Sequence, residues 1–248
     1  MKSSFAGRIV FAGALLTTTV APAKDWYVDA NYGNNEWDGS CKYADRDEDA
    51  KKGPKKWLSE AMLIPDLGEN DVIHAARGVY NEGGSWDGDN TNRVDISKKI
   101  GLVADEGRDV TFIEGALSTD PGAETCGNGP GAVRCVKIST DKGAYLKGFT
   151  VCNGRTDKTK PNDWPDGGGC ISVCGNSAVI DCIVTNGNSA YRGVIAGWGG
   201  GNHDRVPRLC AGNGECGEEY LYILRKDRFH QLHRFRTDIG GRHWRSHH

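Results

Sequence analysis

The chain has little methionine and phenylalanine, almost no net charge and no long apolar run beyond its N-terminus. Only 2 Met and 6 Phe stand against 35 Gly in 248 residues, which suits one elongated domain with many tight corners around a narrow core. The 31 basic and 33 acidic residues give a net charge of -2, so charge does not indicate a nucleic-acid partner. No later segment approaches the ~20 apolar residues of a transmembrane helix, and the mature chain is expected to span no membrane.

Long helical patterns and Cys-x2-Cys pairs are also missing. Short strand-like segments separated by loops of varied length argue against a doubly wound α/β fold. The nine cysteines are odd in number and irregularly spaced, and without a Cys-x2-Cys pair a zinc site is disfavoured. An alternative pairing, Cys126 with Cys135, would staple the glycine-rich loop between them. We expect most of the cysteines near strand-like runs to be small apolar core residues, namely Cys135, Cys152, Cys170, Cys174 and Cys182.

The first 23 residues have the features of a secretory signal. Lys2 and Arg8 precede an apolar run over 9–16, and Ala21-Pro22-Ala23 satisfies the small-x-small rule for cleavage. The apolar run is too short to cross a bilayer. We therefore expect a secreted or cell-surface protein that begins at residue 24 after processing.

Residues 145–189 carry one short motif twice. Its three apolar positions follow the spacing i, i+3, i+5, and in the two copies they are Leu146, Phe149 and Val151, then Val179, Cys182 and Val184. This spacing fits neither a helix nor one uninterrupted strand, and it predicts two short strands joined by a one-residue bend at Gly148 and Asp181. Each copy ends in Asn-Gly, at 153–154 and 186–187, a dipeptide that accepts positive φ and ends a strand.

Stacked copies of this motif resemble a right-handed parallel β-helix of the pectin-lyase-like type. One copy cannot bury its own apolar face, whereas stacked copies can, which is the principle of a solenoid. The resemblance covers roughly residues 25–192 and is one of architecture. It implies an all-β fold with a short N-terminal helix over the open end of the stack, and we expect that capping helix within Lys55–Leu63, after Pro54.

The segments before the repeat predict further short strands and the loops between them. His74 alternates with the inward positions of its strand, so we expect it to be structural. The expected strands lie at 26–28, 71–76, 78–81, 93–96, 100–103 and 110–113. Loops are expected to leave the stack at 82–92, 115–132 and 155–169.

The last part of the chain differs from the rest. Residues 202–248 hold six of the seven histidines and no β-helix period, which fits either a basic binding tail or a stretch foreign to this fold. The codons of Phe229–Phe235, read one base later, can spell Phe-Thr-Asn-Cys-Thr-Val, which is the coil motif again. We therefore hypothesise a C-terminally truncated or frame-shifted family member whose tail is poorly packed. The expected divisions are a signal at 1–23, a β-helix domain at 24–200 and the atypical tail at 201–248.

The insertion at 155–169 is the first candidate site. The resemblance implies chemistry of the polysaccharide lyases, in which a Lys or Arg removes the proton alpha to a uronate carboxyl while carboxylate-bound Ca²⁺ offsets the substrate charge. No lyase motif aligns, and a solvated polar loop is the alternative. The catalytic candidates are Arg155, Lys158, Lys160, Asp163 and Asp166, with Trp164 as a substrate-binding platform.

The segment Trp86–Asn92 is the second candidate site. It resembles the beginning of a calcium loop, with Asp87 and Asp89 as candidate Ca²⁺ ligands. The glycine at the sixth position and the distal glutamate are missing, so an ordinary turn is the alternative. No other cofactor is expected.

These observations together predict an exported monomer that binds or processes polysaccharide or a cell-surface glycan. Flat stacked faces with aromatic and acidic side chains suit a long sugar chain. The enzymatic version is a polysaccharide lyase or a glycoside hydrolase. The alternative is a non-catalytic adhesin or a passenger-type structural protein.

Overall fold

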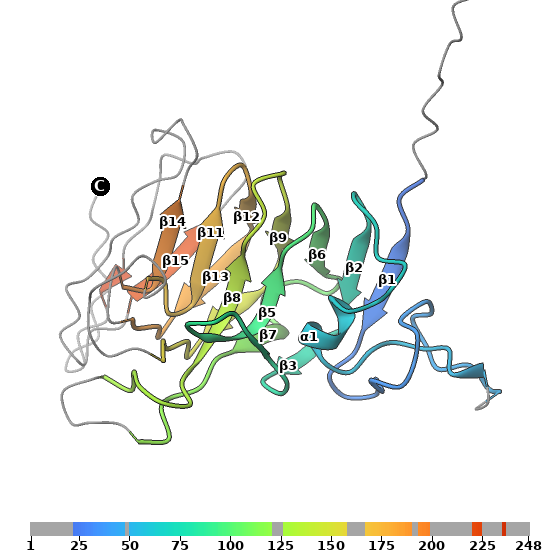
Figure 1. Cartoon of the computed structure of the whole chain (residues 1–248), viewed down its shortest axis with the longest axis horizontal. Helices are drawn as coiled ribbons and strands as arrows, with labels where there is room; N and C mark the ends of the chain where they lie inside the picture. The colour runs from blue at the N-terminus through green and yellow to red at the C-terminus, as the bar shows by residue number, and fades with distance from the viewer. Residues whose placement is uncertain are drawn as a thin grey trace, which may run out of the picture.

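The architecture is that of a mostly β protein with parallel sheets (Figure 1). A computed structural model describes residues 22–47, 50–120, 126–157, 167–189, 193–198, 220–224 and 235–236. The predicted all-β class is confirmed at this level. The predicted signal segment lies almost entirely outside the described residues, as does the 201–248 tail apart from two short strands.

Three sheets contain all the strands within these ranges. Sheet A has the order β1 (Asp25–Val28), β2 (Val72–Ala75), β6 (Gly101–Ala104), β9 (Tyr145–Lys147), β12 (Ala178–Ile180). Sheet B has the order β3 (Gly78–Tyr80), β7 (Thr111–Glu114), β10 (Thr150–Cys152), β13 (Cys182–Thr185), β15 (Tyr220–Leu224), β16 (Phe235–Arg236). Sheet C has the order β4 (Ser85–Trp86), β5 (Thr91–Ile96), β8 (Val133–Ile138), β11 (Ile171–Cys174), β14 (Ile195–Trp198).

The chain visits the three sheets in turn. After β6 in sheet A come β7 in sheet B and β8 in sheet C, and the strands β9 to β11 and β12 to β14 repeat this order. Strands added to a sheet in successive circuits pair in parallel, as β6 with β9 and β10 with β13. The antiparallel pairs are β4 with β5, β13 with β15 and β15 with β16. Figure 1 shows the strands of successive circuits lying side by side in a row from β1 to β12.

The repeated motif folds as its spacing predicts. Leu146 pairs with Val179 between β9 and β12, and Val151 pairs with Val184 between β10 and β13. The bends between the two strands of each copy lie at Gly148, with φ of 80°, and at Asp181, with φ of 52°. The two Asn-Gly pairs end β10 and β13, because Asn153 and Asn186 adopt φ of 62° and 47°.

The core contains small aliphatic side chains and free thiols. The described cysteines predicted for the core are all buried and free: Cys135, Cys152, Cys170 and Cys182. The side chain of Cys174 lies outside the described part of the chain. The alternative disulfide between Cys126 and Cys135 is wrong, because Cys135 is a free thiol whose Sγ lies 3.0 Å from the carbonyl oxygen of Cys152 in the core. Cys126, in the loop outside the sheets, is in a different disulfide.

The expected N-terminal helix forms, but it is short. Helix α1 covers Leu58–Ala61 and buries its two terminal residues against β1 and β5. It cannot extend far beyond Ala61, because Pro65 has no N–H to donate to the carbonyl of Ala61 and disfavours helical geometry at the residue before it. Of the helices described, none is long and apolar enough to cross a membrane.

Candidate functional site

The three loops predicted at 82–92, 115–132 and 155–169 meet beside sheet C. The backbone N–H of Asp157 donates to the side-chain oxygen of Asn90 across 2.9 Å, although the two residues are 67 positions apart in sequence. The backbone N–H of Thr156 donates to the side-chain oxygen of Asn128 across 3.0 Å. The two candidate sites from sequence are therefore neighbours in space.

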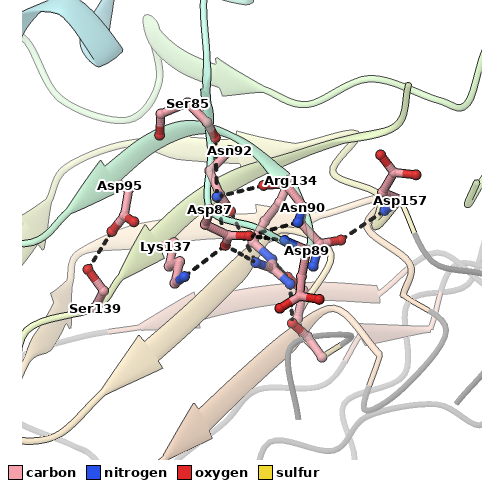
Figure 2. Close-up of polar contacts among 12 residues, drawn as sticks. Ser85, Asp87, Asp89, Asn90, Asn92, Asp95, Arg134, Lys137, Ser139 and Asp157 are labelled. Atoms are coloured by element: carbon pink, nitrogen blue, oxygen red, sulfur yellow. Dashed lines mark hydrogen bonds and ion pairs between the residues drawn. The ribbon is translucent and has the colours of Figure 1, made fainter. Parts of the chain in front are cut away.

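The carboxylate of Asp87 is the centre of the polar network at this place (Figure 2). Its Oδ1 accepts backbone N–H groups of Asp89 at 3.0 Å and Asn90 at 2.7 Å, which closes the turn after β4. Its Oδ2 accepts Nδ2 of Asn92 at 3.0 Å and Nζ of Lys137 at 2.8 Å. The side chain of Asp87 is only 7% exposed, so these donors replace water around the charge.

Arg134 connects this network to the far end of the insertion. The side chain is buried, and its guanidinium donates to the carbonyl oxygens of Gly168 at 2.9 Å and Gly167 at 3.0 Å. It also donates to Oδ1 of Asn92 at 3.0 Å and lies 3.7 Å from Oδ2 of Asp87. A buried guanidinium is stable here because carbonyls and a carboxylate surround it.

Both ends of the insertion are therefore anchored at one place. Asn90 holds its first end at Asp157, and Arg134 holds its second end at 167–168. The segment between these anchors contains most of the site residues predicted from sequence. These residues lie outside the described ranges, and their roles stay predictions: Lys158, Lys160, Asp163, Trp164 and Asp166.

Sequence reasoning missed a row of outward side chains on sheet C. Asp95 in β5 pairs with Lys137 in β8, and Lys137 pairs with Ser172 in β11. The residues on either side of each of them are buried in the core, so alternation places the three on the opposite, outer face. The flanking core residues are Val94, Ile96, Val136, Ile138, Ile171 and Val173. Because neighbouring strands lie ~4.8 Å apart, the carboxylate of Asp95 and the ammonium of Lys137 follow one another at that spacing, whereas Ser172, next in the row, is only 7% exposed.

The two carboxylates near Lys137 have pKa values shifted in opposite directions. Burial alone would raise the pKa of Asp87, but the hydrogen bonds from Lys137, Asn90, Asn92 and Asp89 outweigh it and lower the pKa to about 2. Burial raises the pKa of Asp95 above its ordinary value, and this effect exceeds the opposing hydrogen bond from the Ser139 hydroxyl, which is 2.6 Å long. Asp87 is thus a fixed negative charge, whereas Asp95 is the carboxyl that holds a proton more readily.

Trp86 is an exposed aromatic residue beside this network. It directly precedes Asp87 at the end of β4 and is 60% exposed. The aromatic platform expected from sequence is Trp164, whereas Trp86 belongs to the candidate calcium loop. An exposed indole next to a polar face is a typical stacking surface for a sugar ring or another flat ligand.

Arg155, predicted as catalytic, binds backbone oxygens. Its guanidinium donates to the carbonyls of Cys126 at 2.8 Å, Gly154 at 2.9 Å and Asn186 at 2.6 Å. Burial lowers the pKa of this guanidinium. These bonds tie together loops of neighbouring circuits and give Arg155 a structural role, while its catalytic role stays a prediction.

The calcium assignment finds no support at Asp87. The charges that balance this carboxylate are the side chains of Lys137 and Arg134, at 2.8 Å and 3.7 Å from Oδ2. Asp89 uses its backbone N–H to close the turn. Among the residues whose positions are described, no group of three or more His, Cys, Asp or Glu side chains is arranged to hold a metal ion. The pair Asp87 and Asp89 therefore stays a prediction from sequence.

The chemistry available at the site follows from these contacts. The row on sheet C can exchange hydrogen bonds with hydroxyl and carboxylate groups, and Trp86 can stack on an apolar ring face. No family model, no curated protein and no solved structure matches the chain. Any functional assignment therefore depends on the geometry of this site.

Proposed function

We propose that the chain is an exported, right-handed parallel β-helix protein of pectin-lyase-like architecture that binds polysaccharide along the outer face of sheet C. The strand order supports the fold, because each circuit adds one strand to each of three sheets in parallel register. A right-handed path is the usual one for parallel connections of this kind. Helix α1 is then the N-terminal cap, because it packs on β1 and β5.

The observation that carries the binding function is the outward pair Asp95 and Lys137 on sheet C, with the exposed Trp86 nearby. Parallel pairing places these two groups on neighbouring strands ~4.8 Å apart, so the face offers adjacent charged partners to a polymer. Sugar chains carry hydroxyls, and in uronates carboxylates, at regular intervals. An ammonium, a carboxyl and an exposed indole are suited to such a ligand.

The network favours a polysaccharide-binding protein over an enzyme. Lys137 donates to Asp87 at 2.8 Å, so its side chain is already engaged by a structural carboxylate. A non-catalytic surface protein is therefore the second candidate function. The enzymatic version relies on Asp95, whose pKa is raised by burial and which faces outward from β5.

Affinity electrophoresis in gels that contain pectate, alginate, chondroitin sulfate or a neutral glucan tests this proposal. The protein is expected to migrate more slowly in at least one polymer, and Trp86→Ala should abolish the retardation. Tyr32→Ala is the matched control, because Tyr32 is also an exposed aromatic residue, at 82%, and lies in the loop that follows β1 of sheet A. Normal migration of the unaltered protein in every polymer would contradict polysaccharide binding.

The same mixtures separate an enzyme from a binding protein. Unsaturated products absorb in the ultraviolet when a lyase acts with Ca²⁺, and new reducing ends appear when a hydrolase acts. Either signal, lost in Asp95→Asn, would make the protein an enzyme of that class. Retarded migration without products would identify a non-catalytic surface protein.

A further inference from the structure

The backbone N–H of Lys24 donates a hydrogen bond to a buried carboxylate. Its nitrogen is 2.8 Å from Oδ1 of Asp71, a residue that is 3% exposed at the start of β2. The other oxygen, Oδ2, accepts Nε1 of Trp26 at 2.8 Å and the backbone N–H of Gly68 at 2.8 Å. Burial opposes the charge of Asp71, but these donors and the nearby Lys24 side chain lower its pKa.

This nitrogen is also the one that signal cleavage would release. The small-x-small rule places the cut after Ala23, and both Ala23 and Lys24 are exposed, so a protease can reach the bond between them. Hydrolysis of that peptide bond consumes one water, leaves a carboxylate on Ala23 and leaves an amine on Lys24 that takes up a proton at neutral pH. The neutral amide donor opposite Asp71 thus becomes an ammonium.

We propose that processing at Ala23–Lys24 creates an ion pair between the new α-ammonium of Lys24 and the carboxylate of Asp71, which fastens the first strand of sheet A. In the precursor, the donors to Asp71 within the described part of the chain are two backbone N–H groups and the indole of Trp26, all of them neutral. The amide already donates to an ionised carboxylate, and an ammonium in its place adds the attraction between two opposite charges at the same short distance. The mature chain is therefore more stable than the precursor at the edge where β1 pairs with β2.

Signal cleavage would determine when the first circuit reaches its full stability. Strand β1 is the end strand of sheet A, and its outer backbone groups bond to Gly39 and Lys55. Detachment of this strand would expose the edge of β2 behind it. A precursor without the ion pair opens more easily at this edge. Cleavage then stabilises the first circuit at the moment when the signal segment is removed.

The test compares three forms of the chain that end at residue 248. One begins at Lys24 with a free amine, one begins at Lys24 with an acetylated amine, and one begins at Ala23. The acetylated form is the matched control, because it keeps the N–H donor and removes only the charge. We expect the free-amine form to have an unfolding equilibrium constant on the order of 10-fold lower than the other two, measured by urea denaturation at low ionic strength.

Equal stability of the free and acetylated forms would overturn the proposal, and this comparison does not depend on any substitution. Asp71→Asn, introduced into both forms, provides the second arm. If the variants fold, the advantage of the free amine should disappear in them, and an advantage that persists would assign the effect to a group other than Asp71.

Discussion

The side-chain amide of Asn186 donates a hydrogen bond to the side-chain oxygen of Asn153 across 2.6 Å, and both residues have positive φ. These asparagines follow β13 and β10, which are neighbours in sheet B. The same turn therefore recurs in two successive circuits and is joined side chain to side chain. This contact links the repeat seen in the sequence to the stacking seen in space.

Replacing Asn186 separates the two contributions of this turn. Asn186→Ala removes the hydrogen bond and puts a strained residue at positive φ, for a cost of about 2 kcal/mol, whereas Asn186→Gly removes the bond alone and costs about 1 kcal/mol. Urea denaturation measures both. The exposed Asn176→Ala is the control and should change little, and equal costs for Ala and Gly at 186 would contradict the strain argument.

The stacked core should respond strongly to truncation of Phe149. This side chain is 0% exposed and belongs to the first copy of the repeat, so Phe149→Ala should cost about 3–5 kcal/mol of unfolding free energy. Val79, which is 42% exposed in β3, is the control, and Val79→Ala should change stability by about 0.5 kcal/mol or less. A small loss at Phe149 would mean that this part of the core is loosely packed.

Asp87 should make the protein acid-sensitive. Its pKa is lowered from 3.8 to about 2 in the folded protein, so its stabilising effect is complete above the unfolded value and is lost as pH falls toward the folded one. The melting temperature should fall between pH ~4 and ~2, and this part of the fall should be absent in Asp87→Asn. The variant should also be less stable at neutral pH, because it leaves Lys137 and Arg134 without their carboxylate. An identical acid profile in both proteins would contradict the role given to Asp87.

Asp95 should show the opposite behaviour. Its pKa is raised, so the ionised carboxylate is disfavoured in the folded protein above the unfolded pKa, and stability at neutral pH should be equal or higher in Asp95→Asn. Polysaccharide binding should weaken in the same variant, since the face loses its outward carboxylate while Lys137 stays. Melting curves and affinity electrophoresis check the two effects. A variant that is less stable and binds normally would make Asp95 a structural residue.

The repeat could be predicted from the sequence because local rules determine it. The spacing of Leu146, Phe149 and Val151 and the positive φ of Asn153 and Gly148 depend on nearest neighbours in the chain, and each has the expected conformation. Small buried cysteines were predicted on the same basis.

The candidate site could not be predicted in the same way, because it is formed by residues distant in sequence. Asp95 meets Lys137 only because β5 pairs with β8, and Asp87 meets Arg134 only because the 82–92 loop folds over sheet C. The disulfide considered between Cys126 and Cys135 is wrong because the fold places Cys135 in the core as a free thiol. Closeness in sequence does not show which way a side chain points.

Hydrogen–deuterium exchange with a bound polysaccharide tests the central claim most directly. The polymer with the strongest electrophoretic retardation is the ligand, and peptides that cover 83–95 and 167–173 report on the face of sheet C. We predict slower exchange in these peptides and no change in peptides covering β1 and β2 of sheet A. Protection confined to sheet A, or no protection anywhere in the presence of saturating polymer, would contradict a polysaccharide-binding face on sheet C.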